Sequence, residues 1–247
     1  MNGQLFKQYS RALGRDMECK IFGNAGKICL AFPPQDGRYF DFENFGMVEA
    51  LRPEIEAGKI RLVCADGIDR ETWSAKDRPP RERIETHKAW FRYVLEELVP
   101  ALKAQTPHAP ATLMTTGCSM GAFHAANFFF RAPQIFDTVV ALSGFYHAGF
   151  FFGDYMDDLV YLNSPTDSLR NMPAEHPYMA LFRRSRMIFC VGQGAWEDEL
   201  IDSTRMLDAV LREKSIPAWV DYWGKDVNHD WDWWRIQIRY FVEKLKL

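Results

Sequence analysis

One pentapeptide, Gly117-Cys118-Ser119-Met120-Gly121, constrains this chain more than any other stretch because it fits the pattern G-x-S-x-G. Residues 111–116 are rich in apolar residues and threonine and predict a buried strand, whereas residues 122–131 lack glycine and proline and predict a helix. A serine between a strand and a helix is the nucleophile elbow, whose sharp turn needs small residues two positions before and after it. Gly117 and Gly121 meet that need, so we expect Ser119 to be a nucleophile with the Met120 amide placed to stabilise an oxyanion.

The rest of the chain alternates between strand and helix patterns. Strands are predicted at residues 17–22, 27–32, 59–65, 136–142, 186–191 and 218–223, and helices at 43–57, 82–103, 197–214 and 230–247, with a hairpin-like start formed by the first two strands. Alternation with short loops predicts a mostly parallel sheet covered by helices on both faces, and the place of the elbow fits an α/β-hydrolase fold. An aromatic stretch, residues 145–177, could form a wall of the substrate pocket or a small cap over it. We expect no large lid domain.

Composition narrows the class of protein. The length of 247 residues predicts one α/β domain, 1–247, and a net charge of −3 gives no reason to expect nucleic acid or an anionic membrane as a partner. No apolar run reaches about 18 residues, and the first residues lack a signal-peptide pattern. Five scattered cysteines suggest a reducing cytoplasm, and the absence of C-x-x-C and H-E-x-x-H predicts no metal and no cofactor. Whether the chain forms a homo-oligomer stays open.

A nucleophilic serine needs a histidine base and an acid, which follow an elbow serine in the order acid, then histidine. Of six histidines only His229 follows the final predicted strand, at the start of the last helix. We therefore expect His229 to be the base. The acid should follow the penultimate strand, where Glu197 and Asp198 both stand, and spacing barely separates them.

Two further parts of the site are expected with less support from pattern. The second oxyanion amide should come from the loop after residues 27–32, and because its two prolines have no N–H, Gln35 and Asp36 offer the first amides. Aromatic side chains that could border a substrate are Trp73, Trp196 and Trp231. Such residues more often belong to a core than to a binding site.

Four stretches also give the chain a family resemblance. Residues 13–17, 117–120, 192–194 and 229–234 make it similar to the esterase family of α/β-hydrolases that contains esterase D-like enzymes and mycolyltransferases. The last stretch resembles the family's H-x-W-x-x-W at the catalytic histidine. The resemblance implies a triad of Ser119, Glu197 and His229, ranks Glu197 above Asp198, and places the second oxyanion amide at Gln35.

The sequence thus predicts a serine carboxylic-ester hydrolase that acts through an acyl-enzyme on a small-molecule ester. Two alternatives stay open at this point. An acyltransferase would use the same triad and pass the acyl group to an alcohol, and a non-catalytic binding protein could share the fold.

Overall fold

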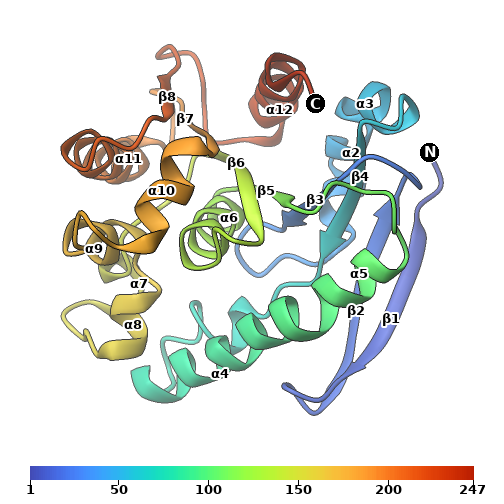
Figure 1. Cartoon of the computed structure of the whole chain (residues 1–247). Helices are drawn as coiled ribbons and strands as arrows, with labels where there is room; N and C mark the ends of the chain where they lie inside the picture. The colour runs from blue at the N-terminus through green and yellow to red at the C-terminus, as the bar shows by residue number, and fades with distance from the viewer.

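The computed structural model describes all residues from 1 to 247, and a single eight-stranded sheet organises them (Figure 1). The strands lie in the order β1-β2-β4-β3-β5-β6-β7-β8. β2 is antiparallel to both of its neighbours, and every other adjacent pair is parallel. The bounds are β1 (Gln4–Ser10), β2 (Arg15–Phe22), β3 (Lys27–Phe32), β4 (Ile60–Ala65), β5 (Leu113–Cys118), β6 (Phe136–Leu142), β7 (Arg186–Val191) and β8 (Trp219–Tyr222).

Helices cover both faces of this sheet, as alternate residues of β3 show. Ile28, Leu30 and Phe32 face one apolar cluster, whereas Cys29 and Ala31 face another. The first cluster is completed by α4 (Pro80–Arg92), a π-helical segment at Tyr93–Leu98, α5 (Val99–Ala104), α6 (Met120–Arg131) and α11 (Asp198–Glu213). The second is completed by α2 (Met47–Ala50), α3 (Arg52–Glu56) and α12 (Trp231–Leu245). The predicted α/β-hydrolase architecture is therefore confirmed.

Two local expectations are wrong, one about the pairing of strands and one, described in the next paragraph, about a helix. The strands at residues 17–22 and 27–32 do not pair with each other, because β4 lies between them. β3 is apolar and buried almost throughout, which suits a central position between parallel neighbours, whereas β2 alternates and lies near the edge. Its antiparallel partner on the other side is β1, which sequence patterning missed.

The helix expected at 43–57 is also interrupted. It forms α1 (Asp41–Asn44), α2 and α3, because Gly46 adopts a left-handed φ of 80° and Pro53 begins a new first turn. The helix expected at 82–103 is continuous from α4 through the π-helical segment to α5 (Figure 1).

The aromatic stretch between β6 and β7 folds into short helices at one end of the molecule (Figure 1). They are α7 (Gly149–Phe152), α8 (Asp158–Leu162), α9 (Pro165–Arg170) and α10 (Pro177–Arg184). Phe151 and Phe152 pack into a small cluster with Met120 and Phe123 of the elbow helix, so this stretch covers the helix beside the candidate nucleophile. No helix in the chain is both long and apolar enough to cross a membrane.

Candidate active site

Ser119 occupies the turn between β5 and α6 with φ 56° and ψ −124°, a strained conformation for a residue with a side chain. The two flanking glycines explain how the turn closes. A Cβ on Gly117 would lie 2.2 Å from the carbonyl carbon and oxygen of Gly121, and a Cβ on Gly121 would lie 2.2 Å from the carbonyl oxygen of Phe32. The first turn of α6 therefore packs directly on the backbone of β5 and on the end of β3, which no larger residue would allow.

The elbow serine meets His229, which lies in the loop between β8 and α12. His229 Nε2 is 3.0 Å from Ser119 Oγ. The histidine backbone donates a hydrogen bond to the carbonyl oxygen of Ala195 at 3.0 Å, and its ring stands edge-on to Trp234 with centroids 4.8 Å apart. The backbone hydrogen bond and the contact with Trp234 thus both fix the position of the imidazole, which faces the serine hydroxyl.

Glu197 and Asp198 occupy opposite environments although they are adjacent. Glu197 has no exposed surface, and its Oε2 is 3.5 Å from His229 Nδ1, a distance at which the two groups attract but are not aligned as a hydrogen bond. Asp198 is the first residue of α11 and is exposed. The geometry therefore places Glu197, and not Asp198, behind His229.

A serine that sequence reasoning missed holds the buried carboxylate. Ser143 follows β6 with a φ of 54°, donates its hydroxyl to Glu197 Oε1 at 2.6 Å, and accepts a hydrogen bond from the Trp234 indole at 3.2 Å. All three side chains are buried. The signal in the sequence was a Ser-Gly pair at the end of a parallel strand next to β5, where strand ends carry functional groups.

The two backbone amides expected at an oxyanion are both free of internal partners. The Met120 N–H opens α6, where the first amides of a helix have no intrahelical acceptor, and it makes no other hydrogen bond. The Gln35 N–H is likewise unpaired, in an exposed turn that is held by a hydrogen bond from Gly37 N–H to the Pro34 carbonyl. Asp36 adopts a φ of 59° in the same turn.

The three tryptophans predicted at the substrate lie in different places. Trp196 is 84% exposed immediately before Glu197, and Trp231 is half-buried at the start of α12, stacked on Phe45. Trp73 has no exposed surface, so its prediction as a substrate contact is wrong for this structure. Its indole donates to His87 Nδ1 and packs on Phe123, and it therefore belongs to the core beneath the elbow helix.

Two of the five histidines set aside from the base role, His87 and His124, lie in a buried polar cluster. His124 Nε2 is 2.8 Å from Asp69 Oδ1, and His87 bonds Asn163 through Nε2 at 3.0 Å. Burial, with further contributions from the neighbouring His124 and from Arg131, holds the pKa of His87 well below its usual value. His87 is therefore a neutral imidazole of the core.

The cysteines are all free and buried. Burial raises the pKa of Cys118, the residue before the candidate nucleophile, well above that of an ordinary thiol. Cys118 therefore stays protonated and acts as a small core residue. No group of three or more His, Cys, Asp or Glu side chains is arranged to hold a metal ion.

A family model described as "Putative esterase" matches residues 10–244 of the chain. The chain belongs to this esterase family. It is accordingly a serine hydrolase of the carboxylesterase type, and the family resemblance seen in the sequence is confirmed. No curated protein matches the chain by sequence.

Solved structures share the fold over nearly the whole chain at low identity. A ferulic acid esterase is 15% identical with a TM-score of 0.74, covering 97% of this chain and 95% of that one. An S-formylglutathione hydrolase (FrmB) from Staphylococcus aureus is 14% identical with a TM-score of 0.70, covering 98% and 95%. Mycobacterium tuberculosis MPT51 (FbpC1) is 14% identical with a TM-score of 0.69, covering 99% and 97%.

Proposed function

We propose that this esterase hydrolyses a small to medium carboxylic ester through a triad of Ser119, His229 and Glu197. The observation that carries the proposal is the 3.0 Å contact between His229 Nε2 and Ser119 Oγ, made by residues 110 positions apart. A buried carboxylate behind the imidazole adds support, because it favours the tautomer whose Nε2 can accept the serine proton.

The chemistry follows from those positions. His229 Nε2 takes the Ser119 proton as Oγ attacks the ester carbonyl, and the carbonyl oxygen gains the charge. The unpaired amides of Met120 and Gln35 would donate to that oxyanion. When the tetrahedral intermediate collapses, the imidazolium gives its proton to the leaving alcohol and an acyl-Ser119 remains. Water, deprotonated by His229, then releases the acid and restores the serine.

Exposed aromatic surface near these groups favours an ester with an apolar, aromatic or sugar part. Trp196 presents most of its surface to solvent next to the triad carboxylate, and Trp231 with Phe45 forms a stacked pair with centroids 4.6 Å apart. Flat rings of this kind stack on aromatic acyl groups and on sugar faces.

Release of p-nitrophenol from short-chain p-nitrophenyl esters tests the proposed activity. Wild type should hydrolyse these esters, and Ser119→Ala and His229→Ala should each lose most of the rate; full activity in Ser119→Ala would overturn the proposal.

Addition of an acceptor alcohol separates hydrolysis from acyl transfer. We expect free acid to remain the main product, whereas conversion of most acyl groups to the new ester would indicate an acyltransferase.

A further inference from the structure

A charged cavity of about 360 Å³ lies at the same sheet edge as Ser119, on the side of β3 and β4. Residues 15–17, 36–38 and 66–71 line it, so it is built from the loops that follow β3 and β4 and from the start of β2. Asp36 belongs to its wall and directly follows Gln35, the candidate oxyanion residue. The cavity therefore lies next to the proposed active site, and none of the three triad residues lines it.

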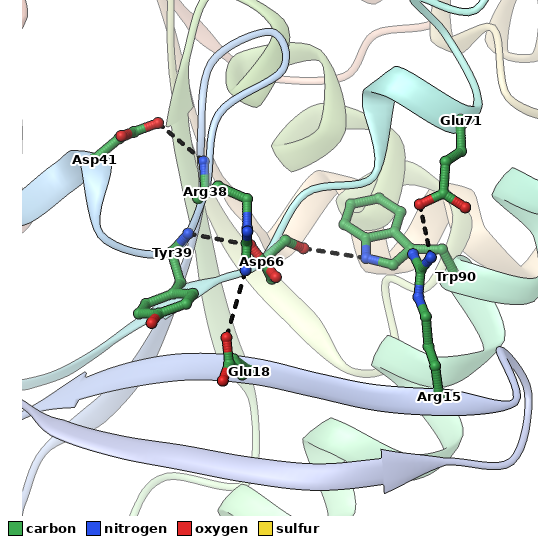
Figure 2. Close-up of polar contacts among 8 residues, drawn as sticks. All are labelled: Arg15, Glu18, Arg38, Tyr39, Asp41, Asp66, Glu71 and Trp90. Carbon is green, nitrogen blue, oxygen red and sulfur yellow. Dashed lines mark hydrogen bonds and ion pairs between the residues drawn. The ribbon is translucent and has the colours of Figure 1, made fainter.

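Two arginines of the cavity wall are already neutralised by carboxylates of the chain (Figure 2). Arg38 Nε is 2.6 Å from Asp66 Oδ1, and Arg15 Nη1 is 2.7 Å from Glu71 Oε1. The Asp66 carbonyl accepts from the buried Trp90 indole at 3.2 Å, which fixes this wall from below. These guanidinium groups are held in place by their own partners, so they are poorly available to an anionic ligand.

Two carboxylate oxygens of the wall are buried and have no hydrogen-bond partner, whereas Arg70, which also makes no ion pair, is exposed to solvent. Asp69 is only 2% exposed, and its Oδ1 is engaged by His124 while Oδ2 has no hydrogen-bond partner. Asp36 Oδ1 is also buried without a partner. A buried carboxylate oxygen left unpaired is costly, and N–H or O–H donors remove that cost.

The net charge of the wall favours a cation among such donors. It holds five acidic residues and three arginines, a net charge of −2, and the third arginine, Arg70, is exposed. A protonated primary amine matches this environment because it supplies both a positive charge and three N–H donors.

We propose that this cavity binds the protonated primary amine of a cationic ester substrate. This inference rests on the proposed function, because it assumes that the ester carbonyl lies at Ser119. β4 is two strands away from β5, and neighbouring strands are about 4.8 Å apart, so the amine should stand about 10 Å from the carbonyl. An alkyl chain of about eight bonds spans that distance.

Matched p-nitrophenyl esters with eight-carbon ω-substituted acyl chains test the inference. The chains end in an ammonium, a hydroxyl or a methyl group, and a second series carries the same ends on the alcohol of acetate esters. In at least one series kcat/KM should be about tenfold or more higher for the ammonium ester than for the hydroxyl ester. Equal or lower values for the ammonium esters in both series would overturn the inference, while hydrolysis itself would still support the proposed function.

Variants connect the preference to the cavity. Asp36→Asn keeps the shape and tolerates the left-handed φ, so it should fold and should reduce the ratio of ammonium to hydroxyl rates toward one. Asp202→Asn removes an exposed carboxylate on α11, outside the cavity, and should leave the ratio unchanged. A ratio that persists in Asp36→Asn would contradict the assignment.

A binding measurement separates failure of this inference from failure of the proposed function. Calorimetric titration of Ser119→Ala with octylammonium should show binding that Asp36→Asn, introduced into the same background, weakens about tenfold. If wild type hydrolysed no ester but octylammonium bound as described, the amine site would be supported and the proposed ester hydrolysis would be contradicted. No detectable heat, together with no ammonium preference, would remove the cavity assignment.

Discussion

Glu197→Gln is the substitution that most sharply tests how the site works, because it changes one atom of a fully buried side chain. The Ser143 hydroxyl donates to Glu197 Oε1 and accepts from the Trp234 indole, and both hydrogen bonds are kept when the residue at position 197 offers an oxygen to Ser143. A glutamine would therefore keep its carbonyl oxygen toward Ser143 and turn its NH₂ toward His229 Nδ1. The imidazole would then carry its proton on Nε2, facing Ser119, and could not accept the serine proton.

The expected loss is large and falls on kcat. The corresponding carboxylate-to-amide change in serine proteases costs about 10⁴-fold, which is about 5 kcal/mol of transition-state stabilisation. Steady-state hydrolysis of a p-nitrophenyl ester would measure it, and the urea midpoint would show that the variant is folded. Asp198→Asn, one residue along in the exposed first turn of α11, should retain activity within about twofold. A large loss in Asp198→Asn with little change in Glu197→Gln would refute the reasoning.

Three further substitutions follow from the same structure. Ser143→Ala leaves the buried Glu197 carboxylate short of a donor, so it should lower the free energy of unfolding by about 2 kcal/mol and lower kcat with little change in KM, as urea titration and kinetics would show. Gly121→Ala would press a methyl group against the Phe32 carbonyl and displace the oxyanion loop, so kcat should fall at least about 100-fold; unchanged turnover would contradict that packing. His87 has a pKa below that of the unfolded chain, so the unfolded state binds more protons and stability should fall as pH drops below about 6.5, by up to about 1.4 kcal/mol per pH unit. His87→Gln should flatten that part of the pH profile of unfolding, and an unaltered slope would show that another group is responsible.

The parts of the site that could be predicted from the sequence are those fixed by local geometry or by chain order. The elbow needs Gly117 and Gly121 within a few residues of Ser119, so its signal is local. The contact between His229 and Ser119 could be predicted because the last parallel strand ends at the sheet edge where Ser119 lies. Both depend on constraints that a single sequence carries.

Other features depend on contacts that spacing does not encode. Glu197 and Asp198 differ by one position, and Glu197 points inward after a turn in which Trp196 adopts a φ of 67°, a conformation that spacing does not predict. From sequence alone, Trp73 is compatible with a place in the core or in a pocket. Its contacts with His87 and Phe123, which the sequence does not reveal, place it in the core. The pairing of β2 with β4 joins strands that are distant in the chain, and such register is set by the whole sheet.

The most direct measurement of the central claim, that Ser119 is an activated nucleophile, is reaction with a fluorophosphonate followed by intact mass. Wild type should gain one adduct per chain, and Ser119→Ala should gain none under the same conditions. Peptide mapping should place the adduct on the segment containing Gly117 to Gly121. A folded wild type that gains no adduct, or an adduct that persists in Ser119→Ala, would contradict the account.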